Sequence, residues 1–239
     1  MKKLYSLLVW VAVFAIAMAY LESAVVVYLR AIWYPEGFEF PLKTLNYQIV
    51  VTEILREAAT MVMLISIAVI AVKEAISRFG IFIYAFAIWD IFYYLFLYLL
   101  LGWPPSLSTW DILFLIPVTW VGPVIAPVIN SLTMILLAVL IVFHRTKDFR
   151  FRLKRIEWVL LILGSFVVIY AYTQPYMHYL LIRYSFNEIL HFREHKDLIE
   201  YSARFIPIRF NWIIFCIAEA LFFIAIINIV RRMKAKNTD

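Results

Sequence analysis

The feature that most constrains this chain is a series of long apolar runs separated by short polar segments. An α-helix rises 1.5 Å per residue, so about twenty apolar residues cross the hydrocarbon core of a bilayer, which is about 30 Å thick. We therefore predict an all-α, polytopic membrane helix bundle with six transmembrane helices. The predicted spans cover about 4–31, 47–72, 79–101, 112–143, 156–182 and 210–230.

Composition supports the membrane class and excludes others. Of the 239 residues, 65% are hydrophobic and 16% are charged, and the mean hydropathy is +0.89. A soluble domain of this size would expose too much apolar surface to stay dispersed. The net charge of +6 is compatible with nucleic acid, but the basic residues lie between apolar runs, so we expect the lipid bilayer as partner and no nucleic acid. The single cysteine, Cys216, excludes an intrachain disulfide and a CxxC motif.

The distribution of basic residues predicts the topology. Fourteen Lys and Arg residues fall on one side of the predicted bundle: Lys2, Lys3, Lys73, Arg78, six within 144–155 and four after 230. The positive-inside rule then predicts a multi-pass protein of the plasma (cytoplasmic) membrane with both termini in the cytoplasm. The Ala17-Met18-Ala19 pattern resembles a signal-peptide cleavage site, but the apolar run continues past it, so we expect an uncleaved anchor.

Prolines interrupt the fourth apolar segment, 112–143, at positions 117, 123 and 127. The segment is too long for one simple span. We predict a proline-broken segment, either a re-entrant half-helix followed by a span or a single strongly kinked helix. The polar stretch 183–209 is predicted to form an extracytoplasmic helix and loop. No separate soluble domain stands out, so residues 1–239 form a single predicted transmembrane domain.

The second predicted span carries several polar side chains on one face. Glu53, Arg56, Glu57 and Thr60 lie at i, i+3, i+4 and i+7, which one face of a helix presents together. Each charge costs about 2.5–3.5 kcal/mol in hydrocarbon, so such residues face the bundle interior, a partner or a wet cavity. We expect Arg56 to pair with Glu53. A net negative charge is then left for another helix or a ligand.

Other spans contribute further acidic residues at similar predicted depth. Because lipid excludes carboxyl groups, we expect them to meet inside the bundle. Hard cations and protons both prefer clustered carboxylate oxygens. The predicted ion- or substrate-binding cluster comprises Glu22, Glu53, Arg56, Glu57, Asp90 and Glu219. The structural alternative is that these residues only hold helices in register through ion pairs and hydrogen bonds.

A second candidate site lies in the polar stretch before the last span. Residues 191–195 read H-x-x-E-H, the letter pattern of inverted zinc proteases. On a helix, Glu188, His191 and His195 share a face, and His178 ends the preceding span. These four residues are candidate ligands for a divalent metal such as zinc or iron. The alternative is a solvated surface helix, because short matches arise easily by chance in charged segments.

Three functional hypotheses follow from these patterns. The first is the handling of a small cation or proton-coupled solute by the carboxylate and arginine cluster. The second is a membrane-embedded enzyme, possibly dependent on a metal, that works at the outer leaflet. The third is an accessory subunit of a larger membrane complex, and homo-oligomerisation is also compatible with the sequence. The cytoplasmic halves of the spans carry few charges, which argues against a continuous polar path.

Overall fold

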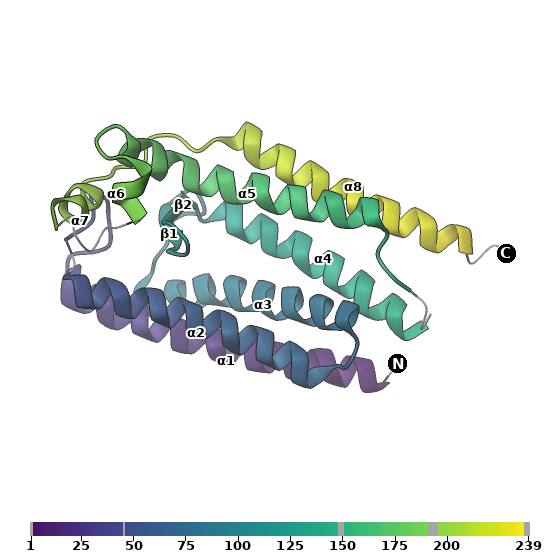
Figure 1. Ribbon diagram of the computed structural model, residues 1–239. Helices are drawn as coiled ribbons and strands as arrows, with labels where there is room; N and C mark the ends of the chain where they lie inside the picture. Colours follow the sequence, from purple (N-terminus) through teal and green to yellow (C-terminus); the bar gives the residue numbers. More distant parts are fainter. Residues whose placement is uncertain (1, 45, 148–150, 191–195, 237–239) are drawn as a thin grey trace.

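The computed structural model describes residues 2–44, 46–147, 151–190 and 196–236 (Figure 1). Six helices are long and apolar enough to span a membrane: α1 (Lys2–Trp33), α2 (Tyr47–Ala71), α3 (Ala75–Leu101), α4 (Ile125–Lys147), α5 (Arg155–Leu181) and α8 (Trp212–Lys236). The remaining elements are the strands β1 (Trp110–Phe114) and β2 (Trp120–Pro123) and the short helices α6 (Phe186–Leu190) and α7 (Lys196–Ala203). The predicted all-α class is confirmed.

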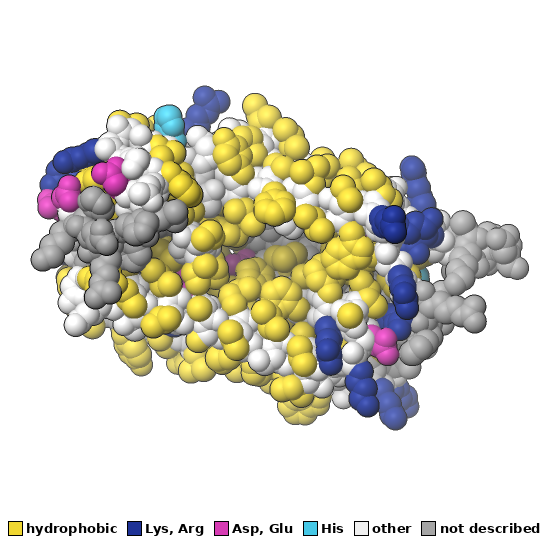
Figure 2. All heavy atoms as spheres, viewed as in Figure 1, with side chains coloured by type: hydrophobic (Ala, Val, Ile, Leu, Met, Phe, Trp, Pro, Cys, Tyr) yellow, Lys and Arg dark blue, Asp and Glu magenta, His cyan; other side chains and the backbone are white. Residues whose placement is uncertain are grey.

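The axes of the six long helices are roughly aligned, and the packing of α3 against α4 joins the two sides of the bundle (Figure 1). Helix α3 packs against α1, α2 and α4, whereas α5 packs along α8, which also contacts α4. Both chain termini lie at one end. The hairpin, α6, α7 and the loop after α1 lie at the other (Figure 1). Lys and Arg side chains gather at the end that holds the termini, and a few lie at the opposite end (Figure 2).

The fourth apolar segment differs from the prediction, because its first part forms strands. β1 and β2 pair antiparallel, with Asp111 opposite Gly122, and the helix begins only at Ile125. Between residues 110 and 147 the structure contains neither a re-entrant half-helix nor a strongly kinked helix. Pro117 and Pro123 cannot donate helical hydrogen bonds, and the aromatic and β-branched residues around them favour strands. Pro127 lies in the first turn of α4, where backbone N–H groups have no helical acceptor.

The hairpin lies inside the bundle, against α5. A Cβ atom at Gly122 would approach the Tyr172 ring to 3.1 Å and Leu113 Cδ1 to 3.2 Å, so only glycine leaves this close approach unhindered. Trp120 also stacks on Tyr172, with ring centroids 5.8 Å apart. The strands therefore bring their side chains and backbone groups into the interior of the bundle at the end opposite the termini, where they meet α2 and α3.

Apolar side chains make up most of the half of the bundle nearest the termini. One cluster joins α1, α2 and α3 through Val11, Leu64 and Ile81, and a second joins α3, α4, α5 and α8, with Ile141 and Ile229 at its centre. Small residues at helix contacts allow the backbones to approach closely. Apart from Lys2 and Lys3, the charged side chains of α1 and α2 lie in the other half, toward the hairpin.

Candidate functional site

The polar face of α2 points toward α1 and the hairpin. Arg56 donates to Glu53 Oε2 from Nε at 2.9 Å and from Nη2 at 2.7 Å, which confirms the pair predicted from the i, i+3 spacing. Two charge-assisted bonds to one oxygen hold the guanidinium in a defined orientation. The remaining edge of Arg56 is free to meet another helix.

Glu22 of α1 meets that edge. It forms an ion pair with Arg56, and Thr60 Oγ1 donates to Glu22 Oε2 at 3.1 Å. One partly buried arginine therefore serves two carboxylates from two helices, and this group carries a net charge of −1 when all three are ionised. Sharing the cation lowers the cost of burying both acids, but it uses the charge of Arg56 completely.

Glu57 is the carboxylate of α2 that Arg56 does not bind. Its side chain is 7% exposed, and its Oε2 accepts from the backbone N–H of Leu115, just after β1, at 2.8 Å. Across the described part of the chain, no basic nitrogen lies within 4 Å of this carboxyl. Its charge is therefore compensated by a backbone dipole and, at longer range, by Arg56 of the same helix.

A second buried ion pair lies on the other side of the cluster and was missed by the sequence analysis. Arg30 Nη2 of α1 lies 3.6 Å from Asp111 Oδ1 of β1, and Tyr94 OH donates to Asp111 Oδ2 at 3.2 Å. The Arg30 guanidinium also lies 3.7 Å from the ring centroid of Trp103 and 4.4 Å from that of Phe38. Arg30 lies near the end of the first apolar run and Asp111 directly before the fourth, and a charge at the edge of an apolar run is the signal that could have identified each of them. Their pairing depends on a fold that joins positions 81 residues apart.

Asp111 lies outside the six long helices, and its protonation is expected to depend on pH in a measurable way. Burial raises the pKa of this carboxyl from 3.8 to about 7, although Arg30, the backbone N–H of Ile112 and the Tyr94 hydroxyl act in the opposite direction. Because the folded pKa is above the unfolded value, the stability that this group contributes is complete below about pH 4 and is lost as pH rises through about 7.

We therefore expect the free energy of unfolding of the wild type, relative to Asp111→Asn, to fall as pH rises from 4 to 7. Chemical unfolding in mixed micelles, followed by tryptophan fluorescence at several pH values, measures this difference. The subtraction removes the other titrating groups that the two proteins share. A difference that stays constant over this pH range would contradict the expectation.

Asp90 and Glu219 occupy different places from the four-residue group of Glu22, Glu53, Arg56 and Glu57. Asp90 accepts from Ser131 Oγ of α4 at 2.7 Å. Glu219 of α8 accepts from Thr133 Oγ1 at 2.8 Å and from the Asn130 amide. The structure thus brings four of the six predicted residues together and places Asp90 beside them. Glu219 is instead joined to α4 by hydrogen bonds.

These groups surround a cavity of about 420 Å³, here called the charged cavity. Its lining includes five carboxyl groups and three basic side chains: Glu22, Glu53, Glu57, Asp90, Asp111, Arg30, Lys43 and Arg56. Aromatic rings from α3 and apolar side chains of α7 complete the walls. On the face shown in Figure 2, the surface is hollowed between α2 and α5, and an acidic side chain lies at the bottom of the hollow.

The predicted metal ligands do not come together in the part of the chain that the structure describes. His178 is exposed on α5, and Glu188 Oε2 accepts from the backbone N–H and the hydroxyl of Ser185, each at 2.7 Å. His191 and His195 lie outside the described residues. Among those described, no group of three or more His, Cys, Asp or Glu side chains is arranged to hold a metal ion.

Comparison of the chain with protein-family models, with curated proteins and with solved structures finds no match. The class of protein therefore rests on the fold and the site. Six helices of spanning length and apolar character indicate a multi-pass membrane protein. Buried charged residues from three of those helices and the hairpin line one cavity within it.

Proposed function

We propose that this protein handles a small cation or a proton-coupled solute, which binds in the charged cavity. The supporting observation is the unbalanced charge of the lining, where five carboxyl groups face three basic side chains. Buried carboxylates without counter-ions are costly, so a bound cation or a proton stabilises the site. This balance favours positively charged ligands over anions.

Glu57 is the proposed ligand or proton carrier. Its carboxyl has no basic partner among the described side chains, whereas Glu22 and Glu53 both bind Arg56. Of the two α2 carboxylates in the predicted cluster, Glu57 is thus the more available, and Glu53 with Arg56 sets the charge beside it. Trp89 and Tyr93 also line the cavity, and aromatic faces attract organic cations.

The two ends of the bundle differ in their access to this site. The charged cavity lies toward the hairpin and α7, whereas the half near the termini consists mainly of the side chains of the two apolar clusters. With cytoplasmic termini, the solute would enter from the extracytoplasmic side of the plasma membrane. Release on the other side would require a second arrangement of the helices, as in alternating access.

Glu57→Gln is expected to weaken binding of a small cation by about tenfold or more, because the amide keeps the shape of the side chain but not its charge. Isothermal titration of purified protein with tetramethylammonium and with sodium measures this effect. Proton flux into liposomes tests the proton-coupled form of the proposal. The melting curve is expected to change little, since the Gln carbonyl still accepts from Leu115.

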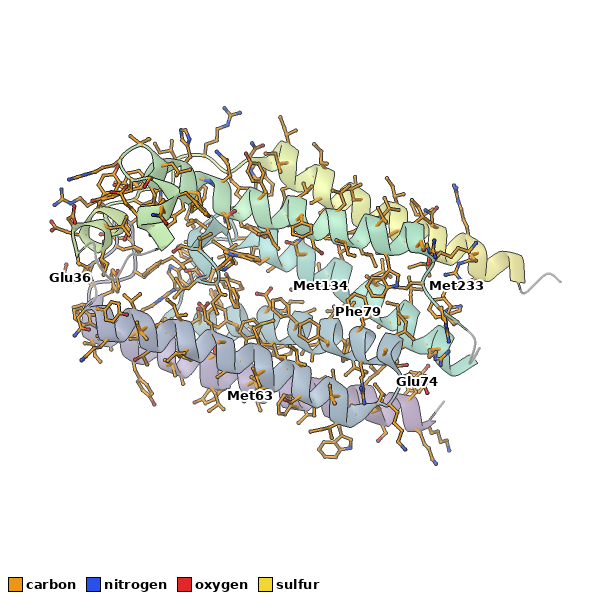
Figure 3. The ribbon with its side chains drawn as sticks, in the orientation of Figure 1. Glu36, Met63, Glu74, Phe79, Met134 and Met233 are labelled. Carbon is orange, nitrogen blue, oxygen red and sulfur yellow. The ribbon has the colours of Figure 1, made fainter. Side chains whose placement is uncertain are left out.

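Glu36→Gln is the matched control, because Glu36 is an exposed acid in the loop after α1, away from the lining of the cavity (Figure 3). It removes the same charge and is expected to leave binding and flux unchanged. If Glu57→Gln binds both cations and carries protons like the wild type, the buried cluster serves only to hold the helices together.

The enzyme hypothesis is the second candidate, and one feature favours it. Helix α7 covers the charged cavity at the hairpin end, with Leu198, Ser202 and Ala203 in its lining. A concave pocket with apolar walls and a few convergent polar groups is a common form of active site. Turnover of a substrate without net transport, abolished by Glu57→Gln, would favour this candidate over transport.

A further inference from the structure

A second cavity of about 400 Å³ lies beside the charged cavity, here called the apolar cavity. Its walls are mainly large apolar side chains, among them Phe79, Phe82, Phe86, Met134, Leu161 and Val168. Phe79 and Met134 lie inside the bundle, between α3, α4 and α5 (Figure 3). Its polar lining residues Asn130 and Ser131 already bond Glu219 and Asp90. The apolar cavity therefore presents hydrocarbon surface to an occupant.

The apolar cavity is elongated along the helices. Its lining extends from Phe79 to Asp90 on α3, from Pro127 to Leu137 on α4 and from Leu161 to Tyr172 on α5. At 1.5 Å per residue each of these stretches covers about 15 Å. Half of a hydrocarbon core about 30 Å thick is about 15 Å, the depth that the chains of one leaflet occupy. The cavity thus has the length and direction of a lipid chain.

The two cavities are adjacent, because Trp89, Asp90, Leu113 and Phe114 line both. The apolar cavity also reaches α2 at Met61 and α5 at Ile169. The hollow in Figure 2 lies between these same helices, on a surface covered with hydrophobic side chains. A molecule in the bilayer can therefore enter from the side without crossing the polar ends of the protein.

We propose that the solute is an amphiphile with an ammonium-bearing head in the charged cavity and a hydrocarbon chain in the apolar cavity. This inference rests on the proposed function and names its substrate class. The excess of carboxyl groups and the rings of Trp89 and Tyr93 select the positive head. The chain is selected by burial, since each methylene removed from water favours binding by about fourfold.

The test uses the full chain in nanodiscs of phosphatidylglycerol, which has no ammonium group. The probe is tetradecyltrimethylammonium with a photoactivatable diazirine at the end of its chain. Mass spectrometry is expected to find cross-links on residues of the apolar cavity. Unlabelled tetradecyltrimethylammonium is expected to displace the probe at a concentration at least about tenfold lower than tetramethylammonium. Tetradecyl sulfate, which has the same chain and an opposite charge, is expected not to compete.

Ser165→Phe is the variant that separates the chain from the head. Ser165 lines the apolar cavity but not the charged one, so a phenyl ring there occupies chain space alone. We expect at least about tenfold weaker binding of the long-chain cation and unchanged binding of tetramethylammonium. Leu163→Phe, on the same helix but in the lining of neither cavity, adds a ring without filling chain space and is expected to leave both affinities unchanged.

The outcomes distinguish the two levels of the proposal. If tetramethylammonium and tetradecyltrimethylammonium bind with equal affinity, and only Glu57→Gln weakens their binding, the proposed function stands and the amphiphile is excluded. Competition by tetradecyl sulfate, or cross-links confined to the outer surface, also overturns the inference, because the head is then not recognised or the chain not enclosed. If neither cation binds and no proton flux is seen, the proposed function itself fails.

Discussion

Arg56→Ala is expected to lower the free energy of unfolding by about 3–5 kcal/mol, because it leaves two buried carboxylates without their shared cation. Glu22 of α1 and Glu53 of α2 both form ion pairs with this guanidinium. It is the cation that these two carboxylates share. Without it, one or both acids must take up a proton or draw in water. Chemical unfolding in mixed micelles, followed by circular dichroism, measures the loss.

Arg204→Ala provides the matched control for this prediction. Arg204 pairs with Glu200 at i, i+4 on α7 and the following turn, but both side chains are more than half exposed. An exposed pair of this kind contributes about 0.5 kcal/mol or less. A triple variant, Arg56→Met with Glu22→Gln and Glu53→Gln, is expected to recover most of the stability, since it leaves no buried charge in the group. Equal losses for Arg56→Ala and Arg204→Ala would show that the α2 group is already hydrated.

Arg232→Ala is expected to cost about 2–3 kcal/mol at the opposite end of the protein. Glu157 of α5 is 1% exposed, and Arg232 of α8 donates to its Oε1 and Oε2 at 3.0 and 2.9 Å from Nη2. The backbone N–H of Lys154 donates to the same carboxyl at 2.6 Å. The expected loss is smaller than for Arg56, because only one carboxylate loses its cation and the Lys154 N–H still donates to it.

Arg231→Ala is the neighbouring control, since Arg231 is exposed on the same turn of α8. The double variant Glu157→Met with Arg232→Met is expected to be more stable than Arg232→Ala, because no charge is left unpaired. Cation binding by the folded fraction is expected to be unchanged in all of these variants, since Glu157, Arg231 and Arg232 do not line the charged cavity. A loss of binding without a loss of stability would instead join this pair to the site.

The charged and apolar cavities together suggest why this bundle contains a hairpin. A straight fourth helix over 112–143 would have satisfied its own backbone and filled the space with side chains. The strands instead bring Asp111 to Arg30 and the Leu115 N–H to Glu57. Non-helical backbone of this kind is tolerated inside a membrane protein where it lies against protein or a polar cavity. The hairpin therefore builds one wall of the charged cavity and, through Trp120, part of the apolar one.

The candidate site was only partly predictable from the sequence. Local spacing predicted the bond between Glu53 and Arg56, because residues three apart on a helix are neighbours whatever the rest of the fold does. The grouping of Glu22 with them followed from the exclusion of charge by lipid, although no local pattern identified Arg56 as its partner. Arg30 and Asp111 were overlooked as a pair because their contact depends on where β1 lies.

The sequence by itself determined the class of this protein. Apolar runs of spanning length can bury their backbone groups in lipid only as helices here, so the six long helices follow from length and hydropathy alone. Only the tertiary structure decided which buried charges meet, that residues 110–123 form strands, and that two adjacent cavities lie between the helices. The physical reason is that insertion of a helix into a membrane depends on the hydropathy of that one segment. Ion pairing and cavity shape depend instead on which faces of different helices pack together.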